Sequence, residues 1–335
     1  MVHRQVAKMD ADMIKKYVSE NGFQLIETHI SWILIGKEFA YKIKKPLKFS
    51  FLDFSSPAKR RFFCGEEVRL NRRLTKDIYL SVVKIAEHGG KMRILEETQE
   101  APVGSLIEYA VKMRTLDGEK KMDKLLLQGK VRESDMKTLA GIVAEFHQKA
   151  EKAKDDYGTP DIIWGQVSDL GNFKETIQKA CRMGASVEFV LGRSKAFMDK
   201  NRGVFLKRIA EGMVKDCHGD LHSGNIFMDN GMIITDCIEF NRDFRCIDVA
   251  SDVAFMAMDL DAFGKSMLSD VFVEEYVSRT HDEGLMPLLG FYKCYRANVR
   301  AKVAAIEWMQ HESSESAERM KKYLTLAEKY AAELR

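Results

Sequence analysis

A short run of polar residues in the second half of the chain has the residue types and the spacing that metal-assisted phosphoryl transfer requires. The run is His218-Gly219-Asp220-Leu221-His222-Ser223-Gly224-Asn225, and Asp236 follows eleven residues after the Asn. In such reactions one Asp accepts the proton of the attacking hydroxyl and an Asn five residues later holds a Mg²⁺ ion, while a second Asp holds the metal that bridges the nucleotide phosphates. The sequence therefore predicts Asp220 as the base, and Asn225 and Asp236 as metal ligands.

The segment between Asn225 and Asp236 has the pattern of a β-hairpin. Two apolar runs, 226–228 and 232–234, flank the turn residues Asp229-Asn230-Gly231. An Asn-Gly pair between apolar runs is a strong hairpin signal. Because a hairpin brings its two ends to the same edge, about 5 Å apart on the scale of the strand spacing, we expect Asn225 and Asp236 to emerge close together.

The His-Gly-Asp motif, with Asn225 five residues beyond Asp220, resembles the brace motif of the aminoglycoside phosphotransferase-like (choline/aminoglycoside kinase type) family of the protein-kinase-like superfamily. The resemblance implies an α+β, bilobal protein-kinase-like fold: an N-terminal five-stranded antiparallel sheet plus a helix, followed by a mainly helical C-terminal lobe. It further implies an ATP- and Mg²⁺-dependent phosphotransferase that acts on the hydroxyl of a small molecule such as a sugar, amino sugar or polyol.

Two alternative functions stay open, an atypical protein kinase and a nucleotide-binding pseudokinase or scaffold. Gly219 stands where protein kinases have an Arg that reads activation-loop phosphorylation, and no Ala-Pro-Glu activation segment is present. Both observations argue against a regulated protein kinase. The intact Asp220, Asn225 and Asp236 argue against a pseudokinase.

The elements that must position these residues follow from hydrophobic periodicity. A helix is predicted at 10–21, strands at 23–27, 32–35 and 39–44, and further strands at 78–86, 91–95 and 106–113. From residue 119 the spacing becomes helical, with a stripe of Leu139, Ile142, Val143 and Phe146 and further helices near 168–182, 187–212 and 314–334. We therefore predict a nucleotide-binding lobe over 1–115 and a catalytic and substrate-binding lobe over 116–335.

The strand at 39–44 contains the candidate nucleotide ligands. Strand alternation puts Ala40 and Lys42 on one face. The resemblance implies that Ala40 leaves room for adenine and that Lys42 reaches the α- and β-phosphates, like the Lys of the kinase Val-Ala-Ile-Lys segment. Lys44 shares that face and Lys45 is a further rival, so the choice of Lys stays open.

A polar turn replaces the Gly-rich loop of protein kinases between the first two strands. Its residues are Glu27-Thr28-His29-Ile30-Ser31. Backbone N–H groups in a tight turn can bind phosphate, with the Thr28 and Ser31 hydroxyls as further donors, although a simple polar turn fits equally well. Met113 ends the last strand and would lead into the hinge that binds adenine.

A helix beginning at Ser55-Ser56-Pro57 and running to about Leu74 is predicted from its Ser cap and its Pro in the first turn. The resemblance implies that this helix supplies a carboxylate to the strand Lys. Glu66 and Glu67 are the candidates, and Glu67 is preferred because it borders the apolar face. The alternative is a surface carboxylate on a charged helix.

Four residues around the polar run are predicted to support it rather than to react. His218 and His222 would brace the loop, with direct catalysis by His222 as the alternative. Asp248 and Asp252 match the Asp pair that enters a helix in the family. Asp248 would cap that helix, and Asp252 would accept backbone N–H bonds from the loop.

Three further residues are possible substrate contacts. Glu239 follows Asp236 closely and would either share the metal or contact substrate. Arg296 and Arg300 lie four residues apart, hence on one face of a helix, where two guanidinium groups would clamp an anionic or polyhydroxy substrate. The alternative for the Arg pair is a solvated helix face.

Composition excludes several classes of protein. The chain has 335 residues with 45% hydrophobic content and a net charge of +3, which indicates a packed core and no nucleic-acid partner. Its six cysteines show no Cys-x-x-Cys pair, so a disulfide framework or zinc site is not expected and a cytoplasmic location is. We expect no signal peptide, no membrane span and no Walker loop. The acceptor and the oligomeric state stay open.

Overall fold

The computed structural model describes residues 9, 11–49, 51–88, 91–103, 105–154 and 156–335. Its residues group into two compact units, which are described separately. The sheet unit comprises residues 1–118 and 233–241, and the helical unit comprises 119–232 and 242–335. The segment 233–241 thus groups with the sheet unit, although it lies far along the chain. The lobe boundary at 115/116 stays a prediction.

The sheet unit consists of an antiparallel sheet, two helices and a small two-stranded ribbon. Its elements are α1 (Ala11–Asn21), β1 (Gln24–Glu27), β2 (Ser31–Ile35), β3 (Phe39–Lys44), β4 (Lys48–Phe49), β5 (Leu52–Asp53), α2 (Pro57–Asn71), β6 (Tyr79–His88), β7 (Lys91–Leu95) and β8 (Leu106–Arg114). The other strands match the predicted ones closely, whereas β4 and β5 were not predicted. Helix α2 ends at Asn71, three residues before the predicted end at Leu74, and Asp10, the predicted start of the first helix, lies outside the described residues.

The main sheet has six strands among the described residues, in the order β1-β2-β3-β8-β6-β7, where we expected five. The sixth strand follows from the sequence itself, since each of the six strand-like runs finds a neighbour. At one edge β1 pairs with β2, and at the other β7 forms a hairpin with β6. The expected α+β class with an N-terminal antiparallel sheet is confirmed.

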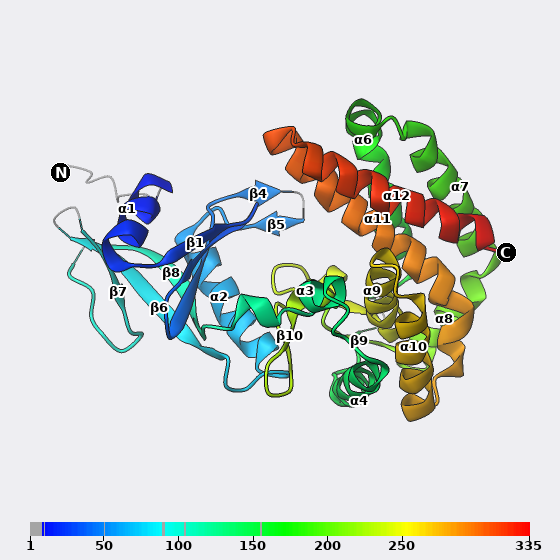
Figure 1. The fold of residues 1–335 in the computed structure, drawn as a ribbon, viewed down its shortest axis with the longest axis horizontal. Helices are drawn as coiled ribbons and strands as arrows, with labels where there is room; N and C mark the ends of the chain where they lie inside the picture. Colours follow the sequence, from blue (N-terminus) through cyan, green and yellow to red (C-terminus); the bar gives the residue numbers. More distant parts are fainter. Residues whose placement is uncertain (1–8, 10, 50, 89–90, 104, 155) are drawn as a thin grey trace. The chain divides into compact units, whose positions relative to one another are not determined.

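Both faces of this sheet are buried, because its strands alternate apolar residues between two cores. One face packs against α1 through Ile14, with Val83 and Ala110 from the strands. The opposite face packs against α2 through Cys64 and Val68, with Val111 from β8. Figure 1 shows these strands and helices in blue to cyan. The side of the sheet that α2 covers carries the site described below.

The helical unit is built from ten α-helices and three short strands among the described residues, apart from β11, which straddles the two units. Its helices are α3 (Met122–Leu127), α4 (Glu133–Lys149), α5 (Pro160–Ser168), α6 (Lys174–Cys181), α7 (Gly184–Lys200), α8 (Arg202–Ala210), α9 (Val249–Ala262), α10 (Ser266–Thr280), α11 (Met286–His311) and α12 (Ser314–Glu333). The strands are β9 (Val214–Asp216), β10 (Ile226–Met228), β11 (Met232–Ile234) and β12 (Cys246–Asp248).

Two of the predicted helices are wrong in extent. The helix expected at 187–212 is two helices, α7 and α8, that divide at Asn201, whose side chain donates to the Phe197 carbonyl at the end of α7. The helix expected at 168–182 is a 3₁₀ turn followed by α6. An Asn that bonds to a local carbonyl competes with helix continuation, which periodicity alone does not reveal.

Helix α9 is the centre of the helical unit. Each residue from Val249 to Leu260 is buried, so this helix is covered on all sides by its neighbours. Phe255 and Met258 of α9 share a core with residues of α6, α7, α11 and α12, and the last two helices appear in orange and red in Figure 1. In the described part of the chain, no helix combines the length and apolar content needed to cross a bilayer.

Candidate active site

In the sheet unit, strand register decides which side chains of β3 face α2. Lys42 lies opposite Val111 of β8, and Ala40 lies opposite Met113. Directly paired residues share a face, and Val111 packs against α2. Ala40, Lys42 and Lys44 therefore all lie on the side of the sheet that α2 covers. Ala40 is buried there beside β8, so its proposed contact with adenine, like that of Met113, stays a prediction.

Lys42 lies between two carboxylates. Its Nζ is 2.9 Å from Glu67 Oε1 on α2 and 2.5 Å from Asp236 Oδ1. Burial disfavours the ammonium form, but the charges of Asp236 and Glu67 outweigh it and hold the pKa of Lys42 well above its usual range. The Asp236 side chain stays 43% exposed. The Asp236 carboxylate is thus accessible to a ligand.

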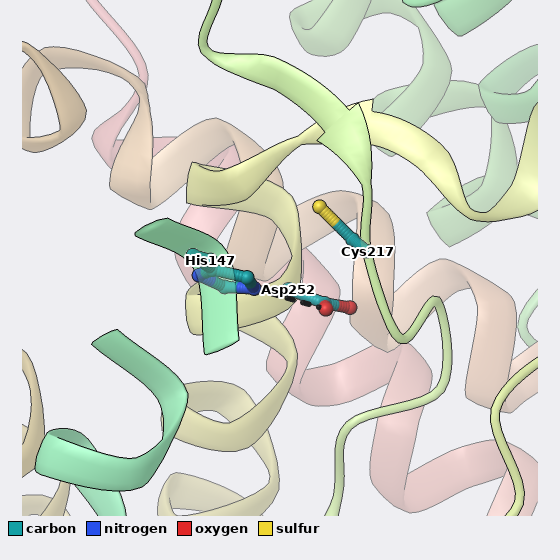
Figure 2. A group of neighbouring side chains, drawn as sticks. All are labelled: His147, Cys217 and Asp252. Atoms are coloured by element: carbon teal, nitrogen blue, oxygen red, sulfur yellow. Dashed lines mark hydrogen bonds and ion pairs between the residues drawn. The ribbon is translucent and has the colours of Figure 1, made fainter. Parts of the chain in front are cut away.

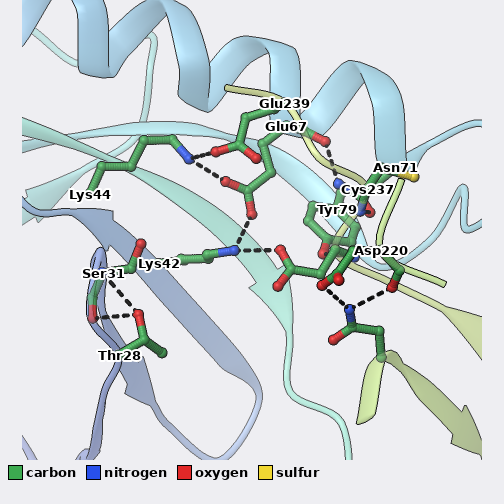
Figure 3. A network of polar contacts seen from close by, with 12 residues as sticks. Thr28, Ser31, Lys42, Lys44, Glu67, Asn71, Tyr79, Asp220, Cys237 and Glu239 are labelled. Carbon is green, nitrogen blue, oxygen red and sulfur yellow. Dashed lines mark hydrogen bonds and ion pairs between the residues drawn. The ribbon is translucent and has the colours of Figure 1, made fainter. Parts of the chain in front are cut away.

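Lys44 forms a second, buried ion-pair set beside the first. Its Nζ is 2.6 Å from Glu67 Oε2 and also pairs with Glu239 Oε1, as Figure 3 shows. Glu67 therefore takes one ammonium group on each carboxylate oxygen. Burial lowers the pKa of Lys44, but Glu239 and Glu67 raise it more, while burial raises the pKa of Glu239.

This arrangement bears on two choices that the sequence left open. Both Lys42 and Lys44 pair with Glu67, whereas Glu66 pairs with Arg69 one turn along the helix surface. Glu239 is only 6% exposed and is committed to Lys44. The expectation that Glu239 meets metal or substrate stays a prediction that this burial disfavours.

The backbone at Asp236 adopts an unusual conformation. Its φ is +69°, which costs a non-glycine residue about 1–2 kcal/mol. Two side chains hold the backbone there: Asp236 N–H donates to Tyr79 Oη at 3.1 Å, and Cys237 N–H donates to Asn71 Oδ1 at 2.9 Å. Sequence reasoning missed Tyr79 and Asn71, because they precede Asp236 by more than 150 positions and carry no local signal.

The β1–β2 turn uses its polar groups internally. Thr28 Oγ1 accepts from Ser31 N–H at 3.0 Å, and Thr28 N–H donates to the Ser31 carbonyl at 2.9 Å. Ser31 is fully buried. The Thr28 hydroxyl thus stabilises the turn, and phosphate binding by Thr28 and Ser31 stays a prediction.

In the helical unit, the run of polar residues 218–225 forms a loop, called the polar loop below. Helices α9 and α11 hold this loop at several points. Asp252 accepts the N–H groups of His218 and Gly219 at 2.8 and 2.9 Å. Arg296 of α11 donates to the Gly219 carbonyl at 3.0 Å. Gly219 has φ +87°, a conformation that favours glycine, which gives a physical reason for Gly at this position.

A second carboxylate of α9 anchors the far end of the loop. Asp259 accepts from Ser223 N–H at 2.9 Å and from its hydroxyl at 2.5 Å. Asp259 was missed by sequence reasoning. A signal existed, because Asp252 and Asp259 are seven residues apart and hence share one face of an apolar helix.

Within the loop, Asp220 is held by its neighbours. Asn225 Nδ2 donates to the Asp220 carbonyl at 3.0 Å and to Asp220 Oδ2 at 2.9 Å. Asp220 N–H donates to His218 Nδ1, and His222 Nε2 lies 3.4 Å from Asp220 Oδ2. Burial raises the pKa of Asp220, but His222, Arg300 and His218 outweigh it and hold that pKa below its usual range. Asp220 is therefore a carboxylate at neutral pH.

Asp248 caps α9 and also belongs to a buried ion-pair network. Its Oδ1 accepts from Ala250 N–H at 2.9 Å. Arg208 of α8 donates to both oxygens of Asp248, at 2.5 and 2.7 Å, and to both oxygens of Asp282. The network was missed, because Arg208 and Asp282 come from elements without a motif. This network joins α8, the start of α9 and the segment that follows α10.

The two arginines of α11 differ in their surroundings. Arg296 is 3% exposed, donates to Ser251 and Gly219, and lies over the Phe255 ring. It therefore supports the loop, and the predicted clamp by two guanidinium groups is not what the geometry favours. Arg300 lies with Nη1 3.3 Å from His222 Nε2, at the side of the loop where Asp220 stands.

A buried group of possible metal ligands lies behind the loop, formed by His147, Cys217 and Asp252 (Figure 2). His147 Nδ1 bonds to Tyr276 Oη at 2.8 Å and its Nε2 lies 3.3 Å from Asp252. Asp252 also accepts two loop N–H groups, and Cys217 Sγ bonds to the Ile247 carbonyl. Each ligand atom is already engaged, so this cluster is a core hydrogen-bond network.

The hairpin predicted between the metal ligands is present, since β10 and β11 form a two-stranded sheet. Asn225 groups with the helical unit, and Asp236 groups with the sheet unit. The proximity of their side chains stays a prediction.

The fold is similar to that of two solved kinase structures. The ethanolamine kinase of Plasmodium vivax matches with a TM-score of 0.51 at 14% identity, over 91% of this chain and 81% of that one. A choline/ethanolamine kinase family protein from Mesorhizobium loti matches with a TM-score of 0.51 at 9% identity, over 97% and 98%. The fold that the His-Gly-Asp motif implied is confirmed.

Particular relatives are found by sequence as well. The uncharacterized protein Rv2004c of Mycobacterium tuberculosis is 29% identical over 298 residues, and the uncharacterized protein Mb2027c of Mycobacterium bovis matches equally. The match covers 87% of this chain but 56% of each relative, so the chain spans little more than half the length of the curated relatives it matches. No family model matches the chain.

Proposed function

We propose that the chain transfers the γ-phosphoryl group of ATP to a hydroxyl of a small molecule, a sugar, amino sugar or polyol, with Mg²⁺ as cofactor. The observation that carries the proposal is the Lys42 ammonium, held between Glu67 of α2 and the half-exposed Asp236. A Lys fixed by a helix Glu beside an accessible Asp is how kinases present a cation to the nucleotide phosphates and an oxygen ligand to their metal.

The residues fit a hard divalent cation. Mg²⁺ prefers oxygen ligands, and Asp236 offers a carboxylate that is 43% exposed. Asn225 uses its amide nitrogen on Asp220, which fixes the side-chain amide so that its oxygen is directed elsewhere. We propose Asp236 as a residue that would hold Mg²⁺, and Asn225 stays the second ligand that the motif spacing predicts; when bound, the ion would neutralise charge on the phosphates.

Asp220 would accept the hydrogen bond of the acceptor hydroxyl and direct its oxygen at the γ-phosphorus. The acceptor oxygen forms the new P–O bond while the bond from the γ-phosphorus to the ADP oxygen breaks. The hydroxyl proton passes to Asp220 and then to water. Because its pKa is held low, Asp220 acts mainly by orienting the hydroxyl. Its anchors Asp252 and Arg296 keep the loop in place.

The test is a screen of hydroxyl-bearing metabolites for Mg²⁺-dependent ADP formation, with the product identified by mass spectrometry. Asp220→Asn is expected to lower kcat by about 10²–10⁴-fold while ATP still binds, since Asp220 is not among the nucleotide ligands. Lys42→Met is expected to weaken ATP binding, whereas Lys48→Met, an exposed Lys of β4, serves as the matched control. Unchanged turnover in Asp220→Asn would refute its assignment.

A further inference from the structure

Three cationic side chains gather around Tyr323, in the helical core that α11 and α12 share. The Arg300 guanidinium of α11 lies 5.4 Å from the Tyr323 ring centroid, and Lys322 Nζ of α12 lies 5.6 Å from the same centroid. Arg319 precedes Tyr323 by one turn on α12, hence on the same face of that helix. The three cations thus form one cluster.

This cluster reaches the polar loop through Arg300. Its Nη1 is 3.3 Å from His222 Nε2, which is 3.4 Å from Asp220 Oδ2. His222 Nδ1 accepts from Gly224 N–H at 3.1 Å, so the ring proton of a neutral His222 is on Nε2. A guanidinium has only donors and cannot bond to a protonated nitrogen. In that tautomer the His222 ring does not accept from Arg300 Nη1, while Tyr323 accepts another hydrogen bond of the Arg300 guanidinium.

Among the described residues, only one of the three cations has a carboxylate partner at ion-pair distance. Within the described residues, neither Arg300 nor Lys322 forms an ion pair with a carboxylate, while Arg319 pairs with Glu307. Burial lowers the pKa of Arg300, but Tyr323 and the neighbouring carboxylates Asp259 and Asp220 outweigh it and raise that pKa. Asp259 also accepts from Ser223. Burial and then repulsion from Arg300 lower the pKa of Arg319. Like charges held together in this way are stabilised by a bound anion.

We propose that the phosphoryl acceptor is an anionic alcohol, whose carboxylate or phosphate group binds Arg300 and Lys322 while its hydroxyl lies at Asp220. The inference rests on the proposed function and names the substrate class of the same site. A guanidinium and an ammonium bind either kind of anion through charge-assisted hydrogen bonds. A cationic acceptor would meet like charge here. The transfer step itself is the one written above, with the anion taking no part in bond breaking.

The test measures binding apart from turnover. The full chain is titrated calorimetrically with a panel of hydroxy acids and phosphorylated alcohols, each beside its neutral parent alcohol and an amino alcohol of similar size. We expect anionic members to bind more tightly than their neutral and cationic counterparts, and the carboxylate and phosphate arms distinguish the two anions. Arg300→Gln and Lys322→Gln should each weaken that binding by about tenfold or more.

Matched variants guard against a folding artefact. Lys322 and Lys321 are both exposed residues of α12, so Lys321→Gln removes the same charge from the same helix and should leave anion binding unchanged. Arg300→Lys keeps a charge and should retain part of the affinity. The proposal is overturned if no anion on the panel binds, if neutral or cationic counterparts bind equally, or if Lys322→Gln and Lys321→Gln behave alike.

The two proposals fail in distinguishable ways. Anion binding that depends on Arg300 without ATP consumption for any panel member would sink the phosphotransferase function and leave the anion site. Phosphorylation of neutral or cationic alcohols, unaffected by Lys322→Gln, would leave the function and sink the anionic acceptor.

Discussion

At the scale of single residues, the two lysines of β3 have separate tasks. Lys42 joins Glu67 to Asp236, which is partly exposed, whereas Lys44 joins Glu67 to Glu239 in the interior. Lys44 also lies 4.9 Å from the Phe54 ring centroid. Only the first set offers a group to a ligand. We therefore regard Lys44 and Glu239 as residues that position the segment around Asp236.

Removal of Lys44 should act on stability. Lys44→Met leaves Glu239 and one oxygen of Glu67 buried without a cation, which typically costs about 3–5 kcal/mol. The double variant Lys44→Met with Glu239→Leu should recover part of that loss, since a buried pair replaced by apolar groups is often neutral. Urea unfolding of both variants measures the difference. If Lys44→Met kept its stability but bound ATP more weakly, Lys44 rather than Lys42 would be the lysine that contacts the nucleotide phosphates.

At the scale of elements, helix α9 supports the polar loop. Its capping residue Asp248, then Asp252 and Asp259, project three carboxylates toward Arg208, the start of the loop and Ser223 respectively. Because every residue from Val249 to Leu260 is buried, these carboxylates are fixed by packing. The loop is thereby held at both ends by one rigid element.

Asp252 should make stability depend on pH in the acid range. Burial raises its pKa, but His147, His218 and Arg296 outweigh it and lower the pKa from 3.8 to about 2. A lowered folded-state pKa contributes stability above pH 3.8 that is lost as the pH falls toward 2, worth about 2 kcal/mol. Unfolding of wild type between pH 5 and 2 should show this loss.

The variant Asp252→Asn should be less stable at neutral pH and should lack that part of the acid dependence. Asp270→Asn, on the exposed surface of α10, is the matched control with the same change of charge. An Asp252→Asn protein with the full acid slope of wild type would show that other groups produce it.

At the scale of the whole molecule, each unit has its own apolar core. Both units contain cysteines, so the reactivity of the thiols measures whether each core opens. Cys64 and Cys237 belong to the sheet unit, and the other four belong to the helical unit. Five of the six are buried, while Cys181 is half-buried. Burial raises the pKa of Cys64 and of Cys294 to about 12, so their reactive thiolate forms are scarce at neutral pH.

The expected outcome is one readily modified thiol in the native protein and six after denaturation, measured with a chromogenic thiol reagent. Cys181→Ser should remove the fast reaction. Rapid modification of several native thiols would mean that one of the two cores opens readily. Acceleration of Cys64 and Cys237 alone by Lys44→Met would place the effect of that variant in the sheet unit.

The sequence determined most of the elements and indicated the fold. Alternation and turn residues located the six strands, and the 218–225 run with Asp236 indicated the fold that the structural neighbours confirm. Local signals suffice for these features, because strand period, Asn-Gly turns and motif spacing are written within a few residues. The divided helix at Asn201 shows where a local signal was present but weak.

Tertiary structure alone decided which polar residues meet. Pairing of Lys44 with Glu239, support of the Asp236 backbone by Tyr79 and Asn71, and the contacts of Arg296 with Gly219 and of Arg300 with His222 all join residues distant in sequence. The local sequence around a charged residue does not show whether its side chain will be buried or exposed. Only the packing of helices and strands determines whether a charge is neutralised inside the protein or left to bind a ligand.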